Sequence, residues 1–341
     1  MHLSDHRVLV TGGAGYVGSA CLRHFRRAGV EAWAFDDLST GNSAAVPGGR
    51  LIVGDILDTA ALTRAMRDHG VTDVLHAAAL ASVPESFDRP DAYWRVNLDG
   101  TRSVMAAMLS AGAGRIVFSS TAAVYRHGAA RPIREDDPLD PLTPYGSSKL
   151  AAAHLIRDLA ARHGLTAVEL RYFNASGADP DGQHGEARAH ETHAIPLLLK
   201  TADGLRPVFD IFGDGFDTPD GTCIRDYVSV IDLAEAHLRA VTRPIPGGHA
   251  VCNLGAGQGV SVRELFELAR EVTGRDIAHR VSPPRPGDPA WLVADITCAG
   301  AVLDWRPTLS LRDILRSAWA WQQARPTGYA PAPAPRKRTM P

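Results

Sequence analysis

The sequence predicts an α/β protein in which a doubly wound parallel sheet is followed by a smaller α/β lobe. Over about the first 170 residues, short apolar runs rich in Val, Ile and Phe alternate with segments of helical spacing. A glycine-rich turn directly follows the first of these runs, and beyond Asn174 the residues Gly, Pro, His and Asp become frequent. Strands that alternate with helices form βαβ units, whose strands lie parallel and whose helices cover both faces of the sheet.

The individual elements follow in order along the chain. The expected strands are the runs RVLVTGG, EAWAFDD, RLIVGD, DVLHAAA and RIVFSS. Helical spacing predicts helices over 18–28, 59–69, 97–111 and 147–163, and later over 228–241 and 261–273. We therefore expect a first domain over residues 1–173, onto which 223–243 packs back, and a second lobe over 174–325. The Pro/Ala-rich stretch 326–341 is expected to be a disordered tail.

Composition and charge exclude several classes of protein. The 341 residues include 36 Lys and Arg against 38 Asp and Glu, whereas a general nucleic-acid binder has a basic excess. The sequence has no run of about 18 apolar residues, which a transmembrane helix needs, and its N-terminus resembles a first strand rather than a signal peptide. The four cysteines are far apart and form no CxxC pair, so we expect reduced thiols. The sequence thus predicts a cytoplasmic protein with neither nucleic-acid nor membrane partners.

A phosphate-binding turn is the first chemical motif. Residues 11–18 read TGGAGYVG, between a predicted strand and a predicted helix. Gly12 permits a tight turn, Gly15 lets a diphosphate approach the backbone, and Gly18 lets the helix pack closely on the strand. The N–H groups at the helix start, where Tyr16 and Val17 lie, favour an anion. The motif is a variant of the dinucleotide fingerprint and predicts a Rossmann-type domain, although a purely structural turn is the alternative.

Acidic residues after the next two strands indicate which dinucleotide binds. Asp36 and Asp37 lie about 20 residues beyond the turn, where a carboxylate can accept hydrogen bonds from ribose hydroxyls. Because a carboxylate there would repel a 2′-phosphate, the sequence favours NAD over NADP. Asp55, followed by Ile56, ends the third strand and is placed to meet the adenine. The alternative is that these aspartates only cap the loops and helices that follow them.

A proton-handling pair follows the fifth strand. Tyr145 and Lys149 in YGSSK are four residues apart in a predicted helix, so both lie on one face. A nearby ammonium and a positive nicotinamide ring would lower the pKa of the phenol toward neutrality. Thr121, at the hydroxyl-rich end of the fifth strand, is placed to bridge the substrate hydroxyl and the phenol. A tyrosine and a lysine at this spacing are more often a surface pair, but with the other motifs they predict alcohol oxidation.

The combined motifs carry a family resemblance. TGGAGYVG, HAAA at 76–79, the hydroxyl-rich strand end and YGSSK resemble those of the extended short-chain dehydrogenase/reductase superfamily. The longer strings RYFNASGADPDG, DGTCIRDYVSVIDLAEAH and RPGDPAWLVAD are similar to the UDP-glucose 4-epimerase family within it. The resemblance covers about residues 7–310. It implies that NAD is the cofactor and that a UDP-sugar is the substrate.

The resemblance also implies roles for individual residues. Tyr145 is then the catalytic base, Lys149 tunes the base and anchors the ribose, and Thr121 is their hydroxyl partner. The other implied positions are Asn97 beside the nicotinamide, Asn174 on the substrate diphosphate, Arg225 and Arg285 on its phosphates, Asp288 on the uridine ribose, and Leu292 as a gate beside the sugar C2 substituent.

The implied reaction interconverts UDP-glucose and UDP-galactose. C4 of the sugar is oxidised by NAD, the 4-keto sugar rotates about its bond to the diphosphate, and the hydride returns to the other face. Because Leu292 is smaller than an aromatic gate, UDP-N-acetylglucosamine is a further expected substrate. Ala122 and Ala123 stand where related dehydratases have acidic residues, which argues against dehydration. The alternatives are a 4-epimerase of a UDP-pentose or a UDP-uronic acid and, from another class, a non-catalytic NAD-binding protein.

A histidine-rich stretch raises the question of a metal. QHGEARAHETH holds His184, His190 and His193, but their spacing does not match a helical zinc pair and no cysteine lies among them. We therefore expect no metal, and we expect this stretch to be a mobile substrate loop.

The expected oligomer is a homodimer, because the resembling family commonly pairs through helices of its cofactor domain. Val104, Met105 and Met108 on the predicted helix 97–111 would provide such a face. Packing of the same three side chains into the protein core is the equally simple alternative.

Overall fold

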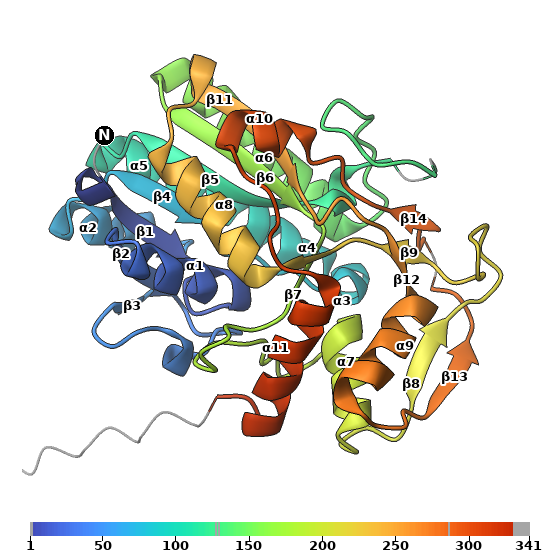
Figure 1. Ribbon diagram of the computed structural model, residues 1–341. Helices are drawn as coiled ribbons and strands as arrows, with labels where there is room; N and C mark the ends of the chain where they lie inside the picture. The colour runs from blue at the N-terminus through green and yellow to red at the C-terminus, as the bar shows by residue number, and fades with distance from the viewer. Residues whose placement is uncertain (1–2, 127, 129, 286, 330–341) are drawn as a thin grey trace, which may run out of the picture.

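A seven-stranded parallel sheet forms the centre of the structure, a computed structural model that describes residues 3–126, 128, 130–285 and 287–329 (Figure 1). Its strand order is β11-β6-β5-β4-β1-β2-β3, and every neighbouring pair is parallel. The strands are β1 Arg7–Thr11, β2 Glu31–Asp36, β3 Leu51–Val53, β4 Asp73–His76, β5 Arg115–Thr121, β6 Thr166–Tyr172 and β11 His249–Leu254. This arrangement confirms the predicted fold class.

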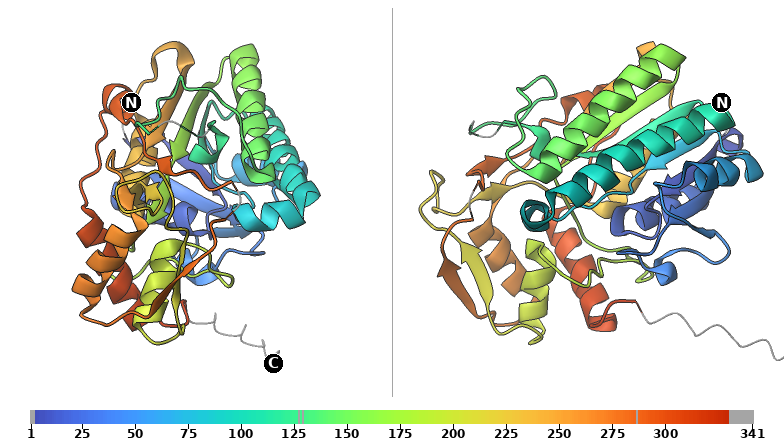
Figure 2. Two further views of the ribbon diagram at one scale, coloured as in Figure 1. Left: turned by 90° about the vertical axis from the view of Figure 1, so that its right-hand side faces the viewer. Right: turned by 180° about the vertical axis from the view of Figure 1, so that it is seen from behind.

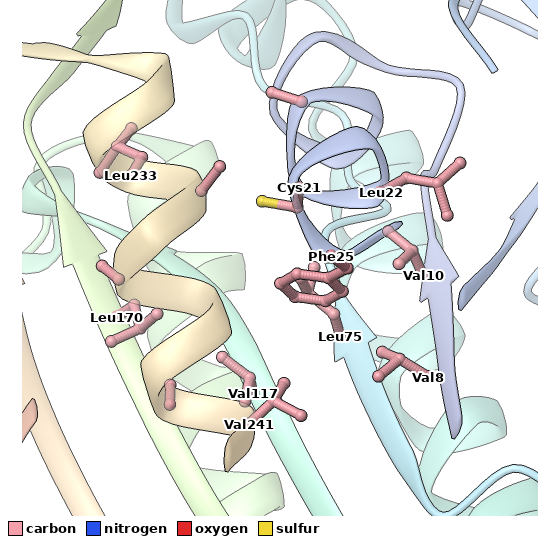
Figure 3. Packing of buried hydrophobic residues seen from close by; sticks show 14 of the residues in the cluster. Val8, Val10, Cys21, Leu22, Phe25, Leu75, Val117, Leu170, Leu233 and Val241 are labelled. Atoms are coloured by element: carbon pink, nitrogen blue, oxygen red, sulfur yellow. The ribbon is translucent and has the colours of Figure 1, made fainter. Parts of the chain in front are cut away.

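Helices cover both faces of this sheet. One layer consists of α1 Tyr16–Arg27, α8 Val230–Thr242 and α10 Thr297–Leu303; the other consists of α2 Thr59–Asp68, α5 Gly100–Ala111 and α6 Pro144–His163. Side chains alternate across β1, so Val8 and Val10 pack beneath α1 and α8 whereas Leu9 packs on the opposite side. Figure 3 shows the first of these layers, with Phe25 and Leu233 facing the sheet from α1 and α8. Figure 2 shows α5 and α6 side by side on the other face.

The helix α5 uses its apolar residues for the core. Val104, Met105 and Met108 are fully buried against the sheet, so these side chains do not form an exposed face. Their packing matches the alternative stated from the sequence. Leu109, in contrast, is 37% exposed on the outer side of α5.

The second lobe forms around a separate apolar cluster below one end of the sheet (Figure 1). Three helices, α7, α9 and α11, pack against one another and against a two-stranded parallel pair, β8 and β13. A three-stranded sheet in the order β12-β9-β14 and the parallel pair β7–β10 connect the lobe to the large sheet. The elements are α7 Ala194–Ala202, β8 Phe209–Phe212, β9 Ile224–Arg225, β10 Tyr227–Ser229, β12 Val260–Ser261, α9 Val262–Thr273, β13 His279–Ser282, β14 Trp291–Leu292, α11 Leu311–Ala324 and β7 Asn174–Ser176.

Short helices complete the fold around the end of the large sheet. They are η1 Leu3–Asp5, η2 Ser43–Ala45, α3 Val83–Asp88, α4 Pro90–Trp94, the π-helical segment η3 Arg95–Asp99, η4 Ala122–Val124 and η5 Pro246–Gly248. Within the described residues, no helix is both long and apolar enough to cross a membrane.

The chain returns to the first domain more often than the sequence predicts. The expected return of 223–243 corresponds to α8, which packs on α1. In addition, β11 pairs with β6 at the edge of the large sheet, and α10 packs on β11. Of the expected tail, 330–341 lies outside the described residues, but the Tyr329 ring packs edge-on against Trp321 with ring centroids 4.9 Å apart.

Asp226 connects the segments that follow β9, β11 and β14. Its buried carboxylate accepts hydrogen bonds from the amides of Ala256, Gly257 and Ala294, with N···O distances of 2.5, 3.1 and 3.1 Å. Burial raises its pKa to about 6, although the three amide bonds act in the opposite direction. One side chain therefore fixes the loops beside Arg225.

Replacing Asp226 with Ala would leave three amides without this acceptor, that of Ala294 buried and those of Ala256 and Gly257 half-buried. We expect the free energy of unfolding to fall by about 3 kcal/mol, because each unsatisfied buried group costs about 1–3 kcal/mol. Urea denaturation measures this loss. Asp276→Ala is the control, since the Asp276 side chain is 96% exposed and its loss should change stability by less than about 0.5 kcal/mol. Equal losses in the two variants would contradict the role given to Asp226.

Candidate active site

Three adjoining cavities form a groove at the carboxyl ends of the central strands. Their volumes are about 450, 640 and 300 Å³, and all three are lined by Gly15, Thr40 and Ala79. In an open parallel sheet, ligands bind at this edge, where the strand order reverses on either side of the first strand. We refer to these spaces as the first, second and third cavity, in that order.

The glycine turn between β1 and α1 forms the floor of the groove. Gly12 has a φ of +69°, and a Cβ built there would lie 2.6 Å from the Ala78 amide nitrogen. A Cβ at Gly18 would collide with the Gly12 carbonyl, so α1 can approach the turn only without side chains at these positions. Gly15 caps α1 without a side-chain hydrogen bond, which leaves the first amides of the helix available to an anion.

Tyr16 and Val17 occupy the first turn of α1 and line the third cavity with the glycines. The Tyr16 hydroxyl donates a 2.6 Å hydrogen bond to the Gly177 carbonyl, and its ring stacks on His184 with centroids 5.5 Å apart. The Tyr16 side chain therefore ties the glycine turn to the segment that follows β7.

Four residues that the sequence assigned to the adenosine end of the cofactor line the first cavity: Asp36, Asp37, Asp55 and Ile56. The carboxylates of the three aspartates already accept hydrogen bonds from backbone amides. Asp36 is buried and accepts from the amides of Ala14 and Leu38 at 3.0 and 2.8 Å, and burial raises its pKa. Asp37 is exposed and accepts from the Ser39 amide and hydroxyl at 2.9 and 2.7 Å. Asp55 accepts from the Leu57 amide at 2.9 Å. Asp36 thus holds the glycine loop, and Asp37 is the more accessible acceptor.

Tyr145, Lys149 and Thr121 lie together around the third cavity. The helix α6 begins at Pro144, and the Thr143 hydroxyl caps it by accepting from the Gly146 amide at 3.0 Å. This start places Tyr145 beside the end of β5, where the Thr121 side chain lowers the pKa of the phenol. Lys149, one turn later, is buried, and its Nζ lies 4.3 Å from the centroid of the Phe118 ring.

Burial dominates the acid–base properties of this pair. It raises the pKa of Tyr145, while the Thr121 hydrogen bond and the positive charge of Arg188 lower it. It lowers the pKa of Lys149 to about 7, against the opposite effect of Glu169. The sequence predicted a lowered pKa for the phenol next to lysine and nicotinamide; in the polypeptide alone, burial outweighs the neighbouring positive charge.

Asn97 connects the loop after β4 to α6. It is buried in the π-helical segment, where its amide oxygen accepts from the Leu80 amide at 2.9 Å. Its amide nitrogen donates to the Leu80 carbonyl and to the Ser148 hydroxyl at 3.1 and 2.9 Å. These bonds hold the loop after β4, which lines the cavities, against α6.

The predicted substrate residues lie in three places: Arg225, Asp288 and Leu292 at the β9–β14 pair, Arg285 beside β8, and Asn174 at the third cavity. Arg225 and Leu292 are register partners, and Arg225 Nη2 lies 3.5 Å from Asp288 Oδ1. The Arg285 guanidinium lies 4.0 Å from the centroid of the Phe212 ring. Leu292 is half-buried against the apolar cluster that includes Ala122, Val124, Tyr125 and Phe173. Asn174 lines the third cavity from β7.

A charged cluster that the sequence did not predict covers the second and third cavities. Arg188 Nε donates to Glu186 Oε1 at 2.8 Å, and His193 Nδ1 lies 3.1 Å from the same oxygen and 2.9 Å from Glu191 Oε1. Burial alone would lower the pKa of His193, but its bonds to Glu186 and Glu191 outweigh this effect and raise the pKa to about 9. The alternation of acidic and basic residues in GEARAHETH was the signal for this network.

The same cluster is the one place, in the described part of the chain, where three possible metal ligands come together: Glu186, Glu191 and His193. Their ligand atoms lie within 4.8 Å of one another. However, the imidazole N–H and the Arg188 guanidinium already satisfy the carboxylates. His184 lies elsewhere, with Nε2 2.9 Å from the Tyr16 carbonyl.

Comparison with known proteins gives a consistent result. The family model described as "NAD dependent epimerase/dehydratase family" matches residues 8–255. A UDP-glucose 4-epimerase of Azospirillum brasilense is 45% identical over 96% of this chain and 95% of its own. One of Streptomyces lividans is 46% identical over 95% of this chain and 98% of its own.

Solved structures show the same similarity. A UDP-glucose-4-epimerase from Stenotrophomonas maltophila, with bound NAD and formylated UDP-arabinopyranose, has a TM-score of 0.91 at 36% identity and covers 94% of this chain and 99% of its own. One from Brucella ovis in complex with NAD has a TM-score of 0.89 at 41% identity, over 92% and 98%. A UDP-Glc/GlcNAc 4-epimerase from Campylobacter jejuni has a TM-score of 0.80 at 33% identity, over 94% and 99%. This chain therefore belongs to the NAD dependent epimerase/dehydratase family and, within it, to the UDP-glucose 4-epimerases.

Proposed function

We propose that Tyr145 is the catalytic base of an NAD-dependent interconversion of UDP-glucose and UDP-galactose at C4 of the sugar. The observation that carries this proposal is the third cavity, where Tyr145, Thr121 and Lys149 line the same space as the glycine turn. Relatives with the same activity in their names match nearly the full length of the chain. A phenol beside a dinucleotide groove is the arrangement that alcohol oxidation requires.

The residues of the groove fit NAD. The glycine turn is a cradle in which side chains at Gly12 and Gly18 would collide with the backbone, and it lies at the start of α1, where amides favour a diphosphate. We assign the diphosphate to this turn, together with Gly15, Tyr16 and Val17. The adenosine end belongs to the first cavity, with Asp37 and Asp36 at the ribose and Asp55 and Ile56 at the adenine. NAD, when bound, supplies the hydride acceptor and donor.

The acid–base work falls to the chain itself. Tyr145 takes the proton from the sugar C4 hydroxyl and returns it when the alcohol is formed again. The Thr121 hydroxyl orients the phenol and the substrate hydroxyl, and the ammonium of Lys149 favours the ionised phenol and holds a ribose. Asn97 acts one step away, by holding the loop after β4 against α6.

The UDP part of the substrate must stay in place while its sugar turns over. Asn174 contacts the substrate diphosphate, Arg225 and Arg285 bind its phosphates, and Asp288 accepts from the uridine ribose. The structure supports this assignment through the fixed position of Arg225, whose Nη1 donates to the carbonyls of Ile224 and Pro289 at 2.9 and 2.8 Å. A guanidinium held in this way is pre-organised for phosphate oxygens.

The proposal predicts that Tyr145→Phe reduces turnover of UDP-galactose at least about 10³-fold, since it removes the group that exchanges the proton. NAD content should not change, and it is read by absorbance after the protein is denatured. The assay uses the protein as purified, with no cofactor added. Tyr93→Phe is the matched control: its ring lies 6.3 Å from that of Tyr145, but its hydroxyl bonds to the Ser82 carbonyl. Near-full activity in Tyr145→Phe would refute the assigned base.

We also propose that UDP-N-acetylglucosamine is epimerised, more slowly than UDP-galactose. Leu292 stands at the gate position and is smaller than an aromatic residue. Leu292→Tyr should lower turnover of the N-acetylated sugar by at least about tenfold, the usual effect of a steric mismatch in an apolar pocket, and leave UDP-galactose within about threefold. Chromatography of both UDP-sugars measures the two rates. A wild-type protein that converts only UDP-galactose would disprove this proposal.

A homodimer is proposed as the working form. Three large apolar side chains are exposed on α3, α4 and α5: Phe87 at 56%, Trp94 at 39% and Leu109 at 37%. A second copy of the chain would cover them. We expect wild-type protein to sediment at twice the chain mass and Phe87→Asp to shift toward the monomer. A wild-type protein that sediments as a monomer at micromolar concentration would contradict the proposal.

We propose the cytoplasm as the location. Cys21, Cys223, Cys252 and Cys298 are all free thiols in the structure. Unpaired cysteines are typical of a reducing compartment.

A further inference from the structure

The charges around the groove are unevenly distributed. The first cavity, at the end assigned to adenosine, is lined by the carboxylates of Asp36, Asp37, Asp55 and Glu85 and by two arginines, Arg89 and Arg95. The third cavity, in contrast, is lined by the basic side chains Lys149, Arg188 and His193. Among the described residues, Arg188 is the one arginine that lines both the second and the third cavity, which meet over Gly15 and Tyr16.

Arg188 is positioned by its neighbours but keeps hydrogen-bond donors for a ligand. In the described part of the chain, its one hydrogen bond runs from Nε to Glu186 Oε1 at 2.8 Å. Glu186 is in turn held by His193. The Glu191 carboxylate fixes His193 by accepting from its ring Nδ1 at 2.9 Å and from its backbone amide at 2.8 Å. The two Nη groups of the guanidinium therefore remain available, on a side chain that is 36% exposed to the groove and solvent.

From this geometry we propose that Arg188 is a further cofactor-binding residue, whose guanidinium contacts the diphosphate of NAD over the first turn of α1. Glu186, Glu191 and His193 are positioning residues that hold the guanidinium there. This inference rests on the proposed function, because it assumes that the dinucleotide occupies the glycine turn.

Charge balance supports the assignment. A dinucleotide diphosphate carries two negative charges, and the glycine turn offers only backbone amides and the dipole of α1. A guanidinium with two free NH₂ groups matches phosphate oxygens better than any other side chain. The positive charge of Arg188 also lowers the pKa values of both Tyr16 and Tyr145, although burial has the larger, opposite effect. The electrostatic field of Arg188 therefore reaches both the glycine turn and Tyr145.

The diphosphate of the sugar nucleotide is the competing ligand for Arg188. We favour the dinucleotide because the second cavity, which Arg188 lines, also contains Ala14, Gly15, Ser39 and Thr40 from the loops after β1 and β2. Of the arginines assigned to the sugar nucleotide, Arg225 lies instead on β9 beside β14, and Arg285 lies on the Phe212 ring of β8. The two diphosphates would thus be served by different arginines.

Arg188→Gln tests the proposal in the full-length protein as purified. We expect NAD to dissociate about tenfold to a hundredfold faster than from wild type, since one charge-assisted contact is lost. UDP affinity, measured by calorimetry with NAD in excess, should stay within about twofold. NAD affinity of the variant should also depend less steeply on salt concentration, a change that a purely structural role would not produce. Arg188→Lys keeps the positive charge but loses the two NH₂ groups of the guanidinium, so its rate of NAD dissociation should lie between those of the wild type and Arg188→Gln.

Arg157→Gln is the matched control, because Arg157 is an exposed arginine of α6 that pairs with Asp158. It should bind both ligands as wild type does. Unchanged NAD dissociation in Arg188→Gln would overturn the proposal, as would weakened UDP binding with NAD retained, or an equal loss of both ligands. A wild-type protein that holds NAD but does not convert UDP-galactose would refute the proposed function and leave this test intact.

Discussion

Close approach between the start of α1 and the loop after β4 is the constraint on which the site depends. A Cβ at Gly12 would lie 2.6 Å from the Ala78 nitrogen, so only glycine allows the turn to lie this close to the loop after β4. This close approach leaves space for the groove above the turn, with the first amides of α1 facing it. The same loop is held from its other side by Asn97, which bonds to Leu80 and to Ser148 of α6. The cradle and the helix that bears Tyr145 are therefore positioned together.

Burial and charge then divide the groove into regions with different chemistry. Carboxylates and arginines both line the first cavity, whereas the third, where Tyr145 and Lys149 lie, is lined by basic side chains and by none of the described carboxylates. Burial opposes the charged form of both Tyr145 and Lys149. The polypeptide thus favours a neutral Tyr145 phenol. Under the proposed function, a positive nicotinamide beside the phenol would favour proton removal and would couple the acid–base chemistry to the oxidation state of the cofactor.

Local patterns predicted the parts of the site that each depend on a few neighbouring residues. The glycine turn, Thr121 at the strand end, and the helix residues Tyr145 and Lys149 all line one cavity, as the sequence indicated. Partners set by the tertiary fold were not predictable. Asp36 accepts from the Ala14 amide of the glycine turn, Met105 faces the core, and β11, which follows α8, joins the edge of the sheet beside β6. The Arg188 network was missed because a loop without periodicity does not reveal which of its charges face inward.

The most direct test of the central claim is the fate of the hydrogen at C4. UDP-galactose labelled with deuterium at C4 is incubated with the purified protein in ordinary water, without added cofactor, and the product is analysed by mass spectrometry and NMR. If the hydride leaves and returns within one site while Tyr145 handles only the hydroxyl proton, UDP-glucose forms with its deuterium retained at C4, and more slowly than from unlabelled substrate. Loss of the deuterium to water, or no conversion, would contradict the account.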